Sequence, residues 1–133
     1  MPIEEKDEEL SPLSGAQIEI MNLVWSGGEV TVSDIWKSLQ LKRPVARTTV
    51  LTVMDRLEKK RWLNRRMVEQ QYLYSAARSR DVTLGGMVER LVETAFAGSA
   101  EDLVVALLGG RGVSDAEAKR IRTLIEIARR KQS

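Results

Sequence analysis

The sequence predicts a mostly helical protein with one small β-hairpin, which lies between an N-terminal and a C-terminal group of helices. Three observations support this fold class. Apolar residues recur with the period of an α-helix through most of residues 14–131. The period changes to two over 62–66 and 71–75, as expected for a pair of strands. Sequences typical of helix capping open four of the helical segments.

Composition excludes several classes of protein. The chain has 133 residues, which is room for one mid-sized domain or two small ones. It lacks both a signal-like start and an apolar run of the roughly 18–20 residues that cross a bilayer, so we expect a cytoplasmic protein without membrane insertion. Cys and His are absent. Their absence excludes disulfides, thiolate nucleophiles, Ser-His triads and nearly all zinc or copper sites. We therefore expect neither an enzyme nor a bound cofactor or metal.

The net charge of +2 is distributed unevenly. Residues 1–10 hold five acids and one Lys, and they lack periodicity, so we expect a flexible acidic tail there. Residues 42–66 hold nine Lys and Arg against two acids, a net charge of +7. Chance clustering in a basic protein is one explanation. The other is an electrostatic footprint for a polyanion such as nucleic acid.

Two short helices are predicted first. Ser14 and Gln17 form a capping box before one that ends at a Gly pair, and its inward residues are expected to be Ile18, Met21, Val24 and Trp25. Thr31 and Asp34 form another capping box before the second helix, over about 32–40. The turn Lys42-Arg43-Pro44 follows, because a residue before Pro disfavours the helical conformation.

A longer helix is predicted over about 46–60. Its buried stripe is Val50, Val53, Met54 and Leu57, and its outer face carries Thr48, Thr49, Thr52, Asp55, Arg56 and Lys59. Short hydroxyl side chains let the backbone approach a flat partner, and Arg can take a guanine edge bidentately. This face is therefore typical of a helix that reads DNA, although a solvated surface helix has a similar composition.

Two helices, a turn and a longer helix followed by a β-hairpin make a winged helix-turn-helix, which we place at residues 11–77. The hairpin would bring Arg65 and Arg66 to the sugar-phosphate backbone. We expect the Trp and Tyr residues to serve packing rather than base stacking. The predicted DNA-binding residues are Arg43, Arg47, Thr48, Thr49, Thr52, Arg56, Lys59, Lys60, Arg65 and Arg66.

Residues 78–133 are predicted to form three helices, over about 82–97, 100–108 and 115–131. Three helices of this length cannot bury their own apolar faces, so we expect a second copy of the chain to cover them. The residues expected in this dimerisation domain's contact are Met87, Leu91, Val92, Phe96, Leu103, Leu107, Ile121, Leu124, Ile125 and Ala128.

These features resemble the penicillinase-repressor family of bacterial transcription repressors (BlaI/MecI/CopY). The resemblance is carried by ARTTVLTVMDRLEKKRWL at 46–63, by Tyr72-Leu73-Tyr74, and by Leu13–Trp25 with VSDIW at 32–36. It covers about 11–130. It implies a homodimeric repressor on a palindromic operator in double-stranded DNA. In β-lactam-sensing relatives, a membrane sensor protease triggers cleavage of the tail and so relieves repression, which implies such a sensor as a partner.

Three departures from the family pattern affect these expectations. Arg61 replaces a common Gly, which costs roughly 1–2 kcal/mol in a left-handed cap unless the helix ends differently. Glu69-Gln70 replaces Gly followed by Arg or Lys, which weakens the attraction of the hairpin for phosphate. The Asn-Phe cleavage pair falls on Ala106-Leu107, which puts cleavage at this bond in doubt. A copper-thiolate switch is excluded because the chain has no Cys.

Two alternatives to a tail-controlled repressor remain at this point. One is a regulator that binds a small effector between its domains. The other is a winged helix that only contacts proteins, against which the +7 segment and the Thr-rich face argue.

Overall fold

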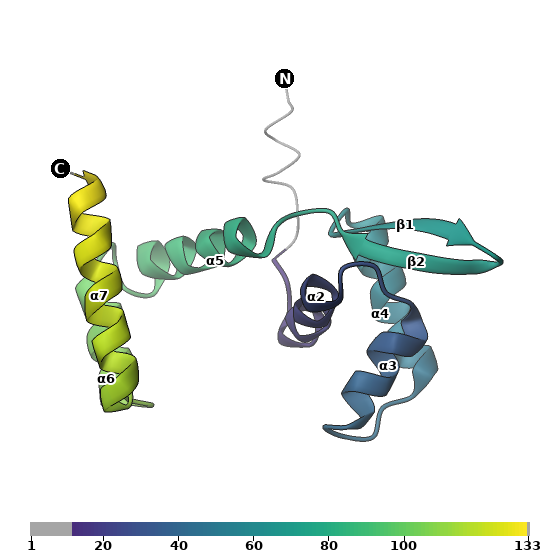
Figure 1. The fold of residues 1–133 in the computed structure, drawn as a ribbon, viewed down its shortest axis with the longest axis horizontal. Coiled ribbons are helices and arrows are strands. Elements are labelled where there is room, and N and C mark those ends of the chain that lie inside the picture. Colours follow the sequence, from purple (N-terminus) through teal and green to yellow (C-terminus); the bar gives the residue numbers. More distant parts are fainter. Residues whose placement is uncertain (1–11, 133) are drawn as a thin grey trace. The chain divides into compact units, whose positions relative to one another are not determined.

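The computed structural model describes residues 12–132, and the described part is mostly helical with one two-stranded antiparallel sheet (Figure 1). The predicted fold class is confirmed. The elements are α2 (Gly15–Gly27), α3 (Val32–Gln40), α4 (Arg47–Lys59), β1 (Leu63–Val68), β2 (Gln71–Ala76), α5 (Arg80–Thr94), α6 (Ala100–Gly109) and α7 (Asp115–Gln132). The predicted flexible tail, residues 1–10, lies outside the described residues.

The chain divides into two compact units, one ending at Gly85 and the other beginning at Gly86. The division falls within α5, so the first turn of this helix belongs to the first unit. The Arg80 Nε donates a hydrogen bond to Asn22 Oδ1 of α2 at 3.4 Å, and Thr83 is buried.

Local capping fixes the first two helices as the sequence predicts. The Gln17 amide donates to the Ser14 hydroxyl at 3.2 Å, and the Ser14 amide donates to the Gln17 side chain at 2.9 Å. The same reciprocal pair joins Thr31 and Asp34, at 3.0 and 2.9 Å. Each box satisfies two donors that a helix start leaves without partners.

The hydrophobic core of the first unit joins α2, α3, α4 and the sheet. Its buried side chains are Ile20, Met21, Val24, Val30, Val32, Ile35, Leu39, Val50, Met54, Leu57, Trp62, Leu63 and Tyr74. The prediction for α2 was partly wrong, because Ile20 is buried whereas Ile18 and Trp25 are half-buried. Trp25 lies at the edge of the core, where its Nε1 donates to the Arg78 carbonyl oxygen at 2.8 Å.

The sheet is a hairpin with a two-residue turn. Val68 pairs with Gln71 across it, and Glu69 and Gln70 between them have φ of 51° and 66°. Two consecutive positive φ values are typical of a type I′ turn, whose twist matches that of the strands. Val30 adds to the far side of β2, exchanging backbone hydrogen bonds with Tyr74 at 2.9 and 2.7 Å. The hairpin is thereby attached to the segment between α2 and α3.

The C-terminal helices follow the prediction with one correction. Helix α5 begins and ends earlier than the predicted 82–97. It begins after Ser79, whose hydroxyl accepts from the Val82 amide at 3.2 Å, and the chain leaves it through Ala97 and Gly98, which both have positive φ. The Ser99 hydroxyl opens α6 and the Ser114 hydroxyl opens α7, each accepting from a backbone amide at 3.0 and 3.1 Å.

Candidate nucleic-acid interface

The outer face of α4 is open to solvent. Val50, Met54 and Leu57 are buried on the inner side, whereas Thr48, Thr49, Thr52 and Arg56 are exposed, as the sequence predicts. Leu51 also lies on the open side with 42% of its surface exposed, which periodicity alone did not single out. An exposed apolar side chain beside Thr residues can contact a thymine methyl group. We name these exposed residues of α4 the reading face.

Side chains of α3 hold the segment that precedes α4. The Trp36 Nε1 donates to the Val45 carbonyl oxygen at 2.8 Å, and the Val45 amide donates to Gln40 Oε1 at 2.7 Å. Both backbone polar groups of Val45 are therefore bonded to one neighbouring helix. These bonds fix where α4 begins, so the reading face has a set orientation on the core.

The end of α4 adopts a Schellman motif. The Trp62 amide donates to the Leu57 carbonyl oxygen at 2.9 Å, and the Arg61 amide donates to the Glu58 carbonyl oxygen at 3.0 Å. Arg61 has φ of 73°, in the left-handed region that favours Gly. The helix end therefore keeps the geometry that Gly supplies in related sequences. Arg61 bears the strain, and Trp62 is drawn into the core rather than starting the strand, which corrects the predicted 62–66.

Carboxylates of the same unit already hold four of the predicted DNA-binding cations. Arg43 donates two hydrogen bonds to Glu19, at 2.7 and 3.0 Å. Arg66 does the same to Glu29, at 2.7 and 2.8 Å. Asp55 lies 3.1 Å from Lys59 Nζ and 3.3 Å from Arg65 Nη1.

These ion pairs keep the three carboxyl groups ionised. Hydrogen bonding by Arg43 lowers the pKa of Glu19, and hydrogen bonding by Arg66 lowers the pKa of Glu29. Hydrogen bonding by Lys59, with a smaller contribution from Arg65, lowers the pKa of Asp55. The Arg66–Glu29 pair is therefore neutral. The clusters of Glu19 with Arg43 and Lys42, and of Asp55 with Lys59 and Arg65, each keep one uncompensated positive charge.

The other predicted DNA-binding cations have no carboxylate partner among the described residues. Arg47 Nε donates to the Ser33 hydroxyl at 3.2 Å, a neutral partner that leaves its charge uncompensated. The side chains of Arg56 and Lys60 have no hydrogen-bond or ion-pair partner among residues 12–132, and both are exposed. The cations that can meet phosphate without giving up a carboxylate are thus Arg47, Arg56 and Lys60, with Arg61 beside them.

The hairpin presents a mixed surface. The Arg65 guanidinium lies 4.1 Å above the Tyr72 ring, which is 39% exposed, and Met67 pairs with Tyr72 across the strands and is also exposed. The packing role expected for the aromatic residues holds for Trp62 and Tyr74 but not fully for Tyr72. Arg66 lies on the opposite face of the hairpin from Arg65.

The second unit leaves its apolar residues exposed. None of the described residues 86–132 is buried in the single chain. Among the residues predicted to make the dimer contact, Leu91, Leu107, Leu124 and Ile125 are exposed, and Met87, Val92, Phe96, Leu103 and Ile121 are only half-buried. Ala128 is exposed as well.

The predicted cleavage pair Ala106-Leu107 lies in the last turn of α6. The Ala106 carbonyl oxygen accepts from the Gly110 amide at 3.0 Å, and the Leu107 carbonyl oxygen accepts from the Gly112 amide at 2.9 Å. A protease binds its substrate in an extended form, so these bonds must open before this peptide bond can be cut.

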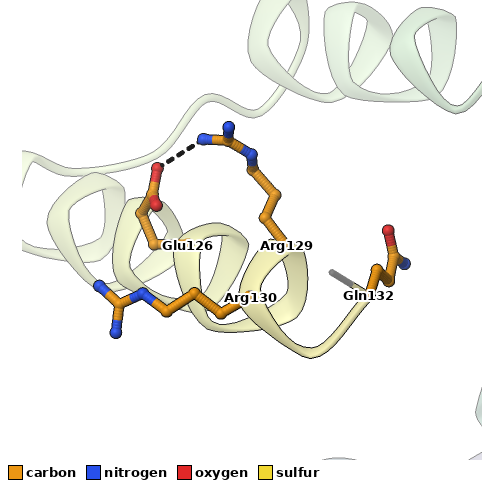
Figure 2. A pocket seen from close by; sticks show the side chains of 4 residues that line it. All are labelled: Glu126, Arg129, Arg130 and Gln132. Carbon is orange, nitrogen blue, oxygen red and sulfur yellow. Dashed lines mark hydrogen bonds and ion pairs between the residues drawn. The ribbon is translucent and has the colours of Figure 1, made fainter.

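The described residues offer little for small-molecule or metal chemistry. A shallow hollow on α7 is lined by Glu126, Arg129, Arg130 and Gln132. Figure 2 shows the ion pair between the first two, in which Arg129 Nη1 lies 2.9 Å from Glu126 Oε2. Residues 12–132 contain no cluster of three metal-ligating side chains. In the same range, the helices are all too short or too polar to cross a membrane.

Comparison with known proteins gives a consistent result. The Penicillinase repressor family matches residues 13–127. The "Transcriptional regulator BlaI" of Mycobacterium tuberculosis is 31% identical over 120 residues, which cover 89% of this chain and 86% of that protein. The "Penicillinase repressor" of Staphylococcus aureus is 23% identical over 85% of this chain and 90% of its own. The solved DNA binding domain of the repressor BlaI covers 54% of this chain and 88% of that one, with a TM-score of 0.50 and 22% identity.

Proposed function

This chain belongs to the penicillinase repressor family of DNA-binding transcriptional repressors, and we propose that it acts as a homodimer on a palindromic operator. We also propose that a signal acting on the C-terminal unit relieves repression. The observation that carries the DNA contact is the reading face of α4, with its exposed Thr and Arg side chains beside unpaired cations.

The proposed contacts divide by chemistry. Thr48, Thr49, Thr52 and Arg56 lie on the reading face and would touch base edges, because hydroxyl and guanidinium groups match the major-groove pattern. Arg47 and Lys60, near the two ends of α4, would neutralise phosphates. Arg43, Lys59, Arg65 and Arg66 would reach phosphate only by exchanging a carboxylate partner, so we expect smaller contributions from them.

The absence of buried side chains in residues 86–132 supports the dimer. Leu124 and Ile125 on α7 are 63% and 53% exposed, and Val105 on α6 is 61% exposed. Apolar faces of this extent are stable only when a partner covers them. A second copy supplies the same faces by symmetry, and a two-fold dimer would place two reading helices on half-sites about 34–36 Å apart.

Binding to DNA is tested by titrating the protein onto a fragment of its own promoter region and onto a scrambled duplex, at two salt concentrations. We expect tighter binding to the promoter fragment, and weaker binding to both duplexes at the higher salt. Equal affinity for the two duplexes would contradict a sequence-specific repressor.

The dimer is tested by ending the chain after Gly85, because Thr83 and the Arg80–Asn22 hydrogen bond keep the first turn of α5 with the first unit. The shortened protein should fold, sediment as a monomer, and bind a full palindrome hardly better than a half-site. Loss of linkage removes an avidity gain of about 10²–10⁴. A shortened protein that still dimerises would place the contact in the winged helix.

A point substitution separates dimerisation from folding of the first unit. Ile125→Asp should dissociate the dimer, whereas Arg122→Asp, on the same helix but at a polar position, should leave it intact. If the C-terminal unit controls DNA binding through dimerisation, Ile125→Asp should lose operator affinity although its reading face is unchanged. Full operator affinity in a monomeric variant would contradict a switch that works by separating the halves.

A further inference from the structure

Asp55 lies on the outer face of α4, and its carboxylate contacts two cations at once. Its Oδ2 lies 3.1 Å from Lys59 Nζ, one turn along the same helix. Its Oδ1 accepts a hydrogen bond from Arg65 Nη1 of β1 at 3.3 Å. The carboxylate therefore joins α4 to the hairpin, two elements that pack against each other in the first unit (Figure 1).

Arg65 is held from two sides. The Asp55 carboxylate is on one side of its guanidinium, and the Tyr72 ring lies 4.1 Å away on another. Only 27% of the Arg65 side chain is exposed, against 70% for Lys59. A guanidinium with an anionic and an aromatic partner is stabilised in place, so moving it to a phosphate would give up both contacts.

We propose that Asp55 limits the affinity of the protein for non-specific DNA by withholding Lys59 and Arg65 from the DNA backbone. This inference rests on the proposed DNA-binding function. Phosphate contacts carry no sequence information and supply nearly all non-specific affinity. Because a phosphate contact contributes to operator and random DNA alike, withholding these cations lowers both affinities and leaves discrimination to the base contacts of the reading face.

The charge at this position argues against the alternative that Asp55 only stabilises the helix. A carboxylate on a face that meets a polyanion repels it, and an i, i+4 ion pair stabilises a helix by only about 0.3–0.5 kcal/mol. Asp55 has 36% of its side chain exposed, and both of its carboxylate oxygens are engaged by the two cations. A carboxylate at this position therefore lowers the affinity of the protein for DNA in general. The benefit that such a residue can bring is weaker non-specific binding.

The experiment compares full-length wild type with Asp55→Asn, which keeps the shape and removes the charge. Binding is measured by fluorescence anisotropy on a scrambled duplex and on the promoter fragment, over a series of salt concentrations. We expect Asp55→Asn to bind the scrambled duplex several-fold more tightly. The slope of log K against log salt should steepen by about 0.9 for each released cation that meets a phosphate, and the affinity for the promoter fragment should rise by a similar factor, because phosphate contacts are common to both duplexes.

Two controls separate this effect from others. Glu126→Gln removes the same charge from an ion pair with Arg129 on α7, and it should change neither the slope nor the affinity for either duplex. In a background with Lys59→Gln and Arg65→Gln, Asp55→Asn should give little further gain. An equal gain in that background would overturn the proposal in favour of simple repulsion between Asp55 and phosphate.

The remaining outcomes are also decisive. Asp55→Ala serves as a second variant, because Ala is the best helix former at an exposed helical position. Should both variants fold and bind the scrambled duplex no more tightly than wild type, Asp55 does not withhold the two cations and the proposal fails. Wild type that binds neither duplex would instead overturn the proposed function itself.

Discussion

The Trp62 amide donates a hydrogen bond to the Leu57 carbonyl oxygen at 2.9 Å, and this bond closes α4 while forcing Arg61 into the left-handed region. Both Trp62 and Leu57 are buried, so the helix end is fixed by the core rather than by the local preference of Arg61. The strain at Arg61 is consequently part of the folded state.

Arg61→Gly should therefore stabilise the first unit. A residue with a Cβ is destabilised by roughly 1–2 kcal/mol in this conformation, and Gly removes that strain. Part of the gain is offset, because Gly has more conformational freedom in the unfolded chain. We expect a net increase of about 1 kcal/mol in the free energy of unfolding, measured by urea denaturation. Lys60→Gly is the matched control, because Lys60 has φ of −87° and no strain to relieve. Equal effects of the two changes would argue against the strain.

Arg56→Ala should weaken operator binding with little effect on stability. Arg56 is exposed on the reading face, and its side chain has no hydrogen-bond or ion-pair partner among the described residues. A base contact predicts a loss of about 1–3 kcal/mol in operator affinity with scrambled DNA nearly unaffected. Equal losses on both duplexes would make Arg56 a phosphate contact, and no loss on either would remove it from the interface. Arg120→Ala, on α7, controls for net charge.

Lys60→Ala should flatten the salt dependence of DNA binding more than Arg66→Ala does. Lys60 has no carboxylate within ion-pair distance in residues 12–132, whereas Arg66 binds Glu29 through two hydrogen bonds. A free cation that neutralises one phosphate contributes about 0.9 to the slope of log K against log salt, and a cation that must exchange a carboxylate contributes less. The slopes are measured by anisotropy on the scrambled duplex. Similar flattening by both variants would show that the Glu29 pair opens readily on DNA.

Acid should destabilise the first unit through its ion-paired carboxylates. The pKa values of Glu19 and Glu29 are lowered from 4.5, by hydrogen bonds from Arg43 and Arg66 respectively. The unfolded chain therefore binds these protons first, so the stabilisation is complete above about pH 4.5 and is lost as pH falls through the lowered values. Urea denaturation from pH 7 to pH 3 should show the decline. Replacing both residues by Gln should make the decline shallower; an unchanged pH profile would assign acid sensitivity to other groups.

Much of the fold follows from local sequence. The capping boxes at Ser14 and Thr31, the apolar stripe of α4 and the strand predicted over 71–75 depend on residues within a few positions of each other, and all are present in the structure. The family pattern in residues 46–63 is equally local. Helix ends near Thr94 were less predictable, because the positive φ of Ala97 and Gly98 reflects a turn that periodicity does not specify.

The sequence by itself determined the winged-helix architecture, the reading face of α4 and the apolar excess of the last three helices, because each depends on spacing along one element. Only the tertiary structure decided which cations are held in ion pairs and which are not. Arg43 meets Glu19 across 24 positions and Arg66 meets Glu29 across 37, and the hairpin brings Arg65 to Asp55 from another element. A charge count treats these Arg residues as equal to Lys60. Folding distinguishes them, because an ion pair depends on distance in space, which sequence separation does not set.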